Sequence, residues 1–226
     1  MSVEKIIAKI ERNRDFYVEF LRTLIQSDSV NPPGNEKNVA LVIEEFLKDL
    51  EIKTEIFPFG NNRANLLAYL NENFEGKNLL YNGHMDVVPP GSETDWKYPP
   101  FSALVKRNKV IFGRGSSDMK SGLAAMAIAL KVLKELNFDL TGNLILNAVA
   151  DEETGGKFGT GWCIDNPLKP IKCDFAVIGE STGMDPLSKA IHLGEKGHLI
   201  LKIKTHGISG HSSMPSIRVK NCICIL

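Results

Sequence analysis

The sequence predicts an α/β protein with a mostly parallel sheet and helices on both faces. Short apolar runs typical of strands alternate along the chain with longer segments whose apolar residues have helical spacing. The run at residues 143–150 is almost continuously apolar, which is typical of a strand buried on both faces of a sheet. Alternation of this kind is the pattern of proteins in which helices cover both sides of a sheet.

The first third of the chain predicts two helices followed by three strands. Residues 3–25 carry apolar side chains at helical spacing, and the Asn-Pro-Pro-Gly sequence at 31–34 ends that helix. A second amphipathic segment covers residues 36–50. The strand-like runs that follow are residues 53–59, 65–70 and 78–82.

The remainder continues the alternation and then changes character. A strand is expected at 109–112, a helix rich in Leu, Ala and Met at 120–136, and further strands at 143–150 and 174–178. Residues 198–205 instead alternate apolar and polar side chains, as in the first strand of a partly exposed sheet. We therefore expect a catalytic-type α/β domain at 1–195 and the beginning of an α+β lid or dimerisation domain at 196–226.

Composition excludes several classes of protein. The 226 residues are 43% apolar and 24% charged, values normal for a globular protein. Lys plus Arg and Asp plus Glu are 27 each, and this balance argues against a nucleic-acid or anionic-membrane partner. No apolar stretch reaches the roughly 18 residues of a membrane span, and the N-terminus lacks the apolar core of a signal peptide. Four cysteines are too few for a disulfide scaffold, so we expect a cytoplasmic protein.

Acidic and imidazole side chains follow several of the predicted strands. His84, Glu152, Glu153 and Glu180 each come just after a strand, and Asp118 lies in a Gly-rich loop after another. Ligands of open α/β sheets bind outside the carboxyl ends of the strands. The sequence therefore predicts that these side chains converge at one edge of the sheet.

Two of these motifs have alternative interpretations. His84 and Asp86 are two residues apart, so Asp86 could hold one ring nitrogen while the other binds a metal; a hydrogen-bonded pair without metal fits equally well. The acidic run at 151–153 could be a solvated loop. It follows directly from an apolar strand, however, and buried adjacent carboxylates require a compensating positive charge. In a metal site, one Glu can bind the ion while its neighbour transfers protons.

The Gly-rich loop is a poor phosphate-binding motif. A Walker A loop requires Gly immediately before Lys-Ser, but Met119 occupies that position and Asp118 would repel a phosphate. A carboxylate that bridges metal ions is a better interpretation of Asp118. His211 lies in a Gly-His-Ser-Ser-Met-Pro turn that could present the imidazole to a ligand, although a helix-capping role for the serines is equally consistent.

Together these residues predict a metal centre of mixed ligands. Imidazole combined with carboxylates suits a dinuclear zinc, cobalt or manganese hydrolase, whereas calcium takes more oxygen ligands and no His. The segments GHMDVVPPG, GRGSSDMKSG, DEETGG, GES and GHSSMP occur in this order between residues 83 and 215, within a match that begins near residue 15. This set resembles the zinc peptidase/deacylase family of acetylornithine deacetylase, succinyl-diaminopimelate desuccinylase, aminoacylase and carboxypeptidase G.

The resemblance implies a role for each matched residue. His84 and Glu180 correspond to ligands of the first metal, Glu153 to a ligand of the second, and Asp118 to the bridging ligand, followed by a cis peptide bond. Asp86 corresponds to the carboxylate that supports His84, and Glu152 to the general base. His211 corresponds to the lid histidine that stabilises the oxyanion and, in dimeric members, reaches the partner's active site.

The implied activity is hydrolysis of an amide bond in an N-acyl amino acid or small peptide. A water bridged by two zinc (or cobalt) ions attacks the amide carbonyl, and Glu152 transfers the proton to the leaving amine. We expect a homodimer for the full-length protein. The family's last metal ligand, a histidine near the end of a longer chain, has no match here, so we expect a truncated chain with a weakened second metal site. The alternative is an inactive family remnant that retains partial metal binding.

Overall fold

The computed structural model describes residues 3–50, 52–72, 75–107, 110–166, 171–183, 191 and 193. Residues Met1–Ser181 form one compact unit, and Thr182–Leu226 form a second. The expected strand at 198–205 and His211 lie outside the described residues, and the predicted domain boundary near 195 stays a prediction.

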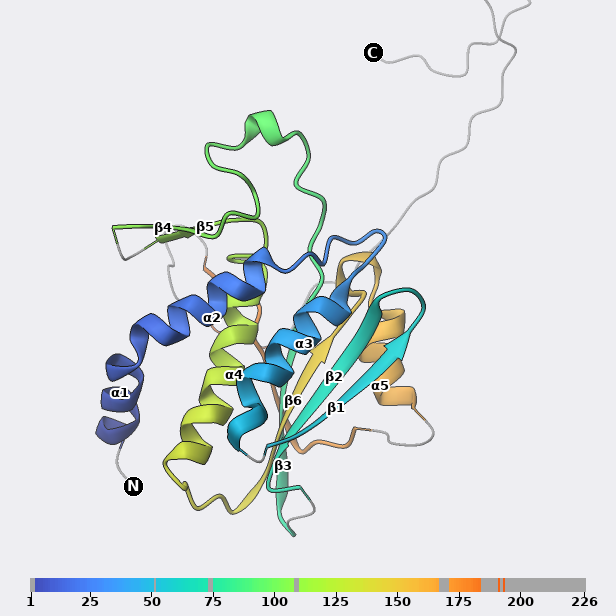
Figure 1. The fold of residues 1–226 in the computed structure, drawn as a ribbon. Coiled ribbons are helices and arrows are strands. Elements are labelled where there is room, and N and C mark those ends of the chain that lie inside the picture. Colours follow the sequence, from blue (N-terminus) through green and yellow to red (C-terminus); the bar gives the residue numbers. More distant parts are fainter. Residues whose placement is uncertain are drawn as a thin grey trace, which may run out of the picture. The chain divides into compact units, whose positions relative to one another are not determined.

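Five strands of the described chain form one mixed sheet, which confirms the α/β prediction (Figure 1). Strands β6, β3 and β7 are parallel, whereas β1 pairs with β2, and β2 with β6, in the antiparallel sense. The β1–β2 pair has to be antiparallel because only residues 60–62 connect the two strands, too few for a crossover. In spatial order the strands are β1 (Lys53–Phe59), β2 (Arg63–Leu70), β6 (Gly142–Val149), β3 (Lys77–His84) and β7 (Phe175–Ile178).

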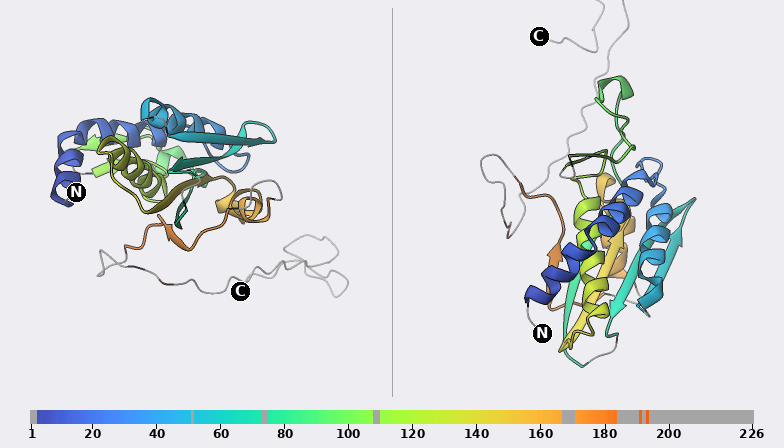
Figure 2. Two further views of the ribbon diagram at one scale, coloured as in Figure 1. Left: turned by 90° about the horizontal axis from the view of Figure 1, so that it is seen from below. Right: turned by 60° about the vertical axis from the view of Figure 1, so that its left-hand side comes forward.

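Helices lie on both faces of this sheet, as predicted (Figure 2). On one face are α1 (Val3–Arg12), α2 (Arg14–Gln26), α3 (Glu36–Leu47) with its 3-10 extension η1 (Lys48–Leu50), and α4 (Lys120–Glu135). The short helix α5 (Trp162–Asp165) lies on the other face, preceded by the turns η3 (Glu152–Thr154) and η4 (Lys157–Gly161). The long connection after β3 contains η2 (Glu93–Asp95) and the small hairpin of β4 (Leu104–Lys106) and β5 (Val110–Phe112).

The prediction of one continuous helix over 3–25 is wrong at Asn13. The chain leaves helical geometry there, and the Asn13 side-chain amide donates a hydrogen bond to the carbonyl of Lys9. Short polar side chains that bond nearby backbone groups in this way compete with the helical hydrogen bonds. The result is two helices, α1 and α2, in place of one.

The main hydrophobic core lies between the sheet and helices α2, α3 and α4. Alternate residues of β2 and β6 point into it, because successive side chains of a strand face opposite sides of the sheet. These residues include Leu66, Ala68 and Leu70 of β2 and Leu144, Leu146 and Ala148 of β6. The intervening side chains Leu67, Tyr69 and Ile145 form a smaller cluster on the α5 side. Strand β6 is therefore buried on both faces, as its apolar sequence predicted.

Paired asparagines fix the register of the central parallel strands. Asn143 and Asn147 of β6 lie opposite Asn78 and Asn82 of β3. Each β6 side chain donates a hydrogen bond to its β3 partner, at 2.6 Å for Asn143–Asn78 and 2.7 Å for Asn147–Asn82. A one-residue slip would break these bonds and deprive the buried side-chain amide of Asn147 of its acceptor.

The connections place the ends of β3, β6 and β7 at one edge. The chain passes from β3 to β6 through α4 on one face, and from β6 to β7 through α5 on the other. Such a reversal creates a crevice at the carboxyl ends of the strands. Among the described helices none is long and apolar enough to cross a membrane.

Candidate metal centre

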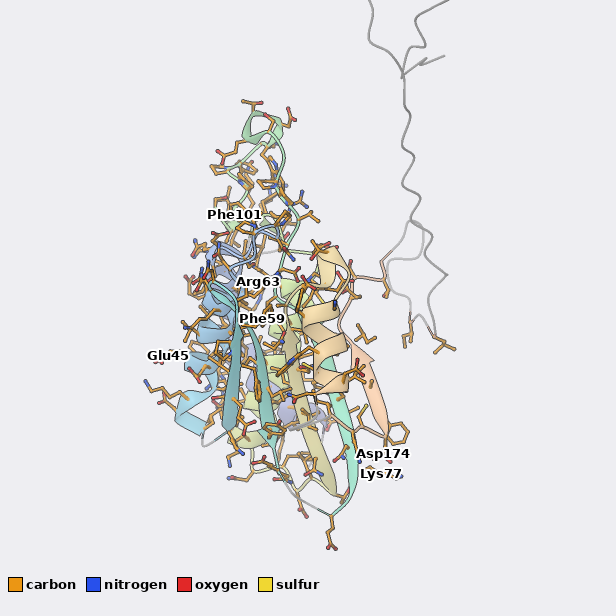
Figure 3. The ribbon with its side chains drawn as sticks, turned by 90° about the vertical axis from the view of Figure 1, so that its right-hand side faces the viewer. Glu45, Phe59, Arg63, Lys77, Phe101 and Asp174 are labelled. Atoms are coloured by element: carbon orange, nitrogen blue, oxygen red, sulfur yellow. The ribbon has the colours of Figure 1, made fainter. Side chains whose placement is uncertain are left out.

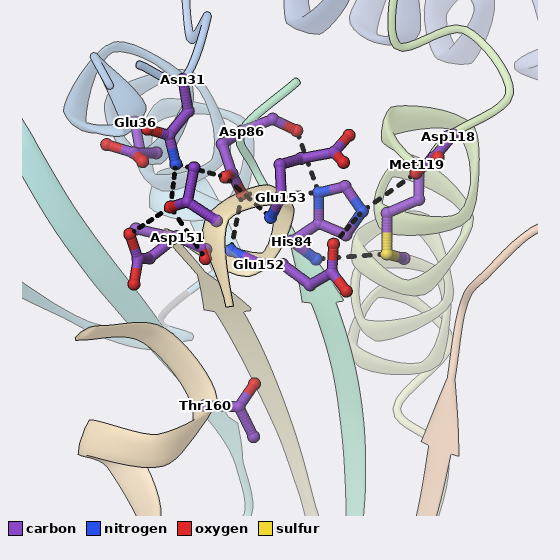
Figure 4. Close-up of polar contacts among 12 residues, drawn as sticks. Asn31, Glu36, His84, Asp86, Asp118, Met119, Asp151, Glu152, Glu153 and Thr160 are labelled. Carbon is purple, nitrogen blue, oxygen red and sulfur yellow. Dashed lines mark hydrogen bonds and ion pairs between the residues drawn. The ribbon is translucent and has the colours of Figure 1, made fainter. Parts of the chain in front are cut away.

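His84 lies at the end of β3 and is almost completely buried, with 1% of its side chain exposed. Its Nε2 atom is 3.0 Å from Asp118 Oδ1 (Figure 4). The same atom is 3.2 Å from Glu180 Oε1. Its Nδ1 atom is 2.9 Å from the backbone carbonyl oxygen of Asp86. Within the described part of the chain, the ligand atoms of His84, Asp118 and Glu180 all lie within 4.8 Å of one another.

Different elements bring Asp118 and Glu180 to His84. Asp118 lies two residues before the start of α4, and the Asp118–Met119 peptide bond is cis, as the resemblance implied. The Met119 sulfur accepts a hydrogen bond from the backbone N–H of His84 at 3.2 Å. Glu180 follows Gly179 at the end of β7, where Gly179 lies directly against Gly122 of α4. The convergence predicted from strand ends is therefore found for these three residues.

This set of donors fits a transition-metal ion such as zinc or cobalt. It combines an imidazole nitrogen with carboxylate oxygens, the ligand types that these ions accept together. A hydrogen bond from Nδ1–H to the Asp86 carbonyl would leave Nε2 free to bind the ion, the usual arrangement of a metal-binding histidine. The carboxylates remain accessible, since 59% of the Asp118 side chain and 37% of the Glu180 side chain are exposed.

The electrostatics of the site also favour a cation. Burial alone would lower the pKa of His84, but its interactions with Asp86 and Glu180 raise that pKa to about 11. The imidazole thus carries the positive charge that the surrounding carboxylates require. A bound metal ion would supply that charge instead.

The carboxylate of Asp86 organises the turn after β6. Buried Asp86 accepts a hydrogen bond from the Asn31 side chain at 2.8 Å. It also accepts bonds from the backbone N–H groups of Glu152 and Glu153, both at 3.2 Å. Burial would raise the pKa of Asp86, but the nearby His84 and the hydrogen bond from Asn31 lower it. The carboxylate is 3.5 Å from His84 Nδ1, farther than the Asp86 carbonyl oxygen, so its support of His84 stays a prediction.

Glu152 and Glu153 both lie beside the three-residue group. Glu152 Oε2 is 3.6 Å from His84 Nε2. Burial raises the pKa of both glutamates, and the neighbouring Asp118 charge raises that of Glu153 further. Among the described residues Glu153 does not join the metal-binding group, so its role in a second metal site stays a prediction.

A polar network that no sequence pattern indicated lies behind this turn. Buried adjacent carboxylates require a positive charge, and in the structure Arg63 at the start of β2 supplies one. Arg63 Nη2 is 3.2 Å from Asp151 Oδ1 and 2.6 Å from Glu36 Oε1. The demand for a counter-charge was readable from the sequence, but which of 27 Lys and Arg residues meets it was not.

Comparisons with known proteins agree with this geometry. The model of Peptidase family M20/M25/M40 matches residues 80–220. A succinyl-diaminopimelate desuccinylase from Coxiella burnetii is 34% identical over 201 residues, covering 88% of this chain and 52% of the relative. The corresponding protein of Wolbachia pipientis is 34% identical over 202 residues, covering 88% and 49%. The chain spans about half the length of these curated relatives.

Solved structures share the fold. An M20 family metallo-carboxypeptidase from Sulfolobus solfataricus superposes with a TM-score of 0.62 at 27% identity, covering 72% of this chain and 37% of that chain. Human carnosine dipeptidase 1 superposes with a TM-score of 0.63 at 23% identity, covering 78% and 41%. The second likeness concerns the fold alone.

Proposed function

The chain belongs to Peptidase family M20/M25/M40, and from this we propose that the whole protein hydrolyses an amide bond in an N-acyl amino acid or small peptide with the help of two zinc or cobalt ions. One observation carries the proposal: His84, Asp118 and Glu180 converge, with a glutamate of raised pKa, Glu152, beside them. The names of relatives, a desuccinylase and a metallo-carboxypeptidase, support this class of substrate.

Each residue has a defined task in this mechanism. His84, Asp118 and Glu180 would hold the first ion, and Asp118 and Glu153 would contribute to the second. When bound, the ions would lower the pKa of a water molecule and polarise the amide carbonyl. Glu152 accepts the proton of the attacking water at its carboxylate and delivers it to the leaving amine nitrogen. His211 would donate a hydrogen bond to the oxyanion.

The elevated pKa of Glu152 suits this work. A general base is most effective when its pKa approaches the working pH, and burial raises the pKa of Glu152 in that direction. Asp86 fixes its backbone through the N–H group of Glu152. A cytoplasmic location, a homodimeric full-length protein and the absence of nucleic-acid and membrane partners belong to the same proposal.

In the whole protein, the test compares Glu152→Gln with the unaltered form on N-acetyl and N-succinyl amino acids and dipeptides, with added zinc or cobalt. We expect kcat to fall by about 10²- to 10⁴-fold with unchanged metal content, because Gln cannot accept the proton. Glu45→Gln, an exposed glutamate of α3, is the control. Removal of metal by EDTA should abolish turnover, and zinc or cobalt should restore it.

Two results would contradict this proposal. Full activity of Glu152→Gln would remove Glu152 as the base. If zinc or cobalt binds but the unaltered chain releases no amine from any substrate, the chain is the inactive metal-binding remnant.

A further inference from the structure

A continuous path of polar contacts links the metal centre to strand β2. From Asp86 it passes through the Asn31 amide to the Thr154 hydroxyl, at 2.8 and 3.0 Å. Thr154 Oγ1 donates to Asp151 Oδ1 at 2.8 Å, and Asp151 pairs with Arg63. Figure 4 shows the part from Asp86 to Asp151 around the turn that carries Glu152 and Glu153.

Asp151 determines the shape of that turn. Its backbone has a φ of 71°, in the left-handed region that few non-glycine residues other than Asn and Asp adopt. Its carbonyl oxygen accepts hydrogen bonds from the N–H groups of Thr154 and Gly156, and its Oδ2 from that of Phe158 at 3.1 Å. One aspartate thus anchors the chain on both sides of Glu152 and Glu153.

The guanidinium of Arg63 anchors Asp151 in turn. Arg63 forms a two-pronged contact with the fully buried Glu36, through Nη2 at 2.6 Å and Nε at 3.0 Å, and the same Nη2 reaches Asp151. Its position is fixed from the other side as well, because the guanidinium lies over the Phe59 ring with 5.3 Å between Cζ and the ring centre. Figure 3 shows Arg63 and Phe59 together at one end of the β1–β2 pair.

We propose that Arg63 is a positioning residue of the reaction: by joining buried Glu36 to Asp151, it fixes the turn that presents Glu152 and Glu153 to the metal centre. The catalytic consequence rests on the proposed function; the effect on the turn does not. Arg63 acts on the metal centre through Asp151, with which its Nη2 pairs. A lysine cannot replace it, because an ammonium lacks the planar fork that meets both carboxylates.

The test measures backbone hydrogen exchange of residues 151–158 together with metal affinity and steady-state kinetics, on the full chain. Arg63→Lys should accelerate exchange in this segment and lower kcat by about 10- to 100-fold, as expected for the loss of a supporting residue behind a metal site. KM and the affinity of the first metal ion should stay close to those of the unaltered chain, because His84, Asp118 and Glu180 are not held by the turn. Exchange in β6 should also stay unchanged.

Matched variants separate positioning from general destabilisation. Arg22→Lys is the control, since Arg22 also bonds a carboxylate and a carbonyl, those of Glu19 and Ala103, but far along the sequence from the turn. Glu36→Gln removes the charge on the other side of Arg63 and should reproduce the faster exchange in milder form. Normal exchange at 151–158 in Arg63→Lys, or faster exchange spread evenly over the chain, would overturn the proposal. Suppose that hydrogen exchange in Arg63→Lys is faster only at residues 151–158, but the unaltered chain shows no turnover. This result would uphold the positioning of the turn by Arg63 and refute the proposed function.

Discussion

The contact between Gly122 and Gly179 offers a direct test of how the fold builds the metal centre. Gly122 lies in the first turn of α4, and Gly179 immediately precedes Glu180. A Cβ atom placed on Gly122 would be 1.9 Å from the carbonyl oxygen of Gly179, whereas real Cβ atoms almost never approach another atom closer than 3.0 Å. In Gly122→Ala the two backbones must therefore separate by at least 1.1 Å, the difference between these distances.

That displacement is large on the scale of metal coordination. The distance from a metal ion to each of its ligands stays within about 0.2 Å of its standard value. A shift of Gly179 would also shift its neighbour Glu180, and so would disturb this distance. We expect the affinity for the first zinc or cobalt ion to fall by about 10- to 100-fold. The helix itself would favour the change by about 0.5–1 kcal/mol, since Ala replaces Gly in a helix. Weaker metal binding without a matching loss of metal-free stability is thus the expected signature.

The assay is competition for zinc with a chromophoric chelator, alongside thermal unfolding of the metal-free chain. Ser121→Ala is the control, because it changes the adjacent residue of α4 and removes only a 3.5 Å contact with the carbonyl of Ser117. Zinc affinity of Gly122→Ala equal to that of Ser121→Ala would refute the reasoning. It would mean either that Glu180 is not a ligand or that the strand end adapts without moving it.

Two further predictions concern stability. Asn147→Leu should lower the free energy of unfolding by about 1–3 kcal/mol in urea titrations, because Asn82 loses the buried donor 2.7 Å away. Asn143→Leu, at the more exposed end of the same pair of strands, should lower it by less. Equal losses in the two variants would contradict this reasoning. Burial lowers the pKa of Lys120 from 10.5 to about 7, so between these values the unfolded chain binds more protons and stability rises with pH. A pKa difference of one unit corresponds to about 1.4 kcal/mol, so the free energy of unfolding of the unaltered chain should rise by at most about 5 kcal/mol relative to that of Lys120→Met between pH 7 and 10.5. Urea titrations at several pH values measure this, and parallel pH profiles of the two proteins would contradict it.

Local sequence patterns identified the elements and the chemistry of the site. The strand at 53–59 was located with the bounds of β1, and the helix expected at 120–136 differs from α4 by one residue. Strand-end positions picked out His84, Asp118 and Glu180, which the structure brings together. The elements were predictable because apolar periodicity is set by burial within one element, and His84 and Glu180 because parallel strands present their carboxyl ends at one edge. Asp118 instead follows β5, which belongs to the separate β4–β5 hairpin, so the tertiary structure brings it to the site.

What the sequence left undetermined depends on contacts between distant segments. The 3-residue connection 60–62 made the first pair of strands antiparallel, but no pattern in the sequence indicated that β2 would pair with β6. Nor did any pattern link Arg63 to Asp151, which is 88 positions away, or place Gly122 against Gly179. Periodicity reports which face of an element is buried, not what it is buried against. The sequence by itself thus determined the α/β class and the candidate ligands, while the tertiary structure alone decided strand order, the counter-charge at Asp151 and the backbone contact beside Glu180.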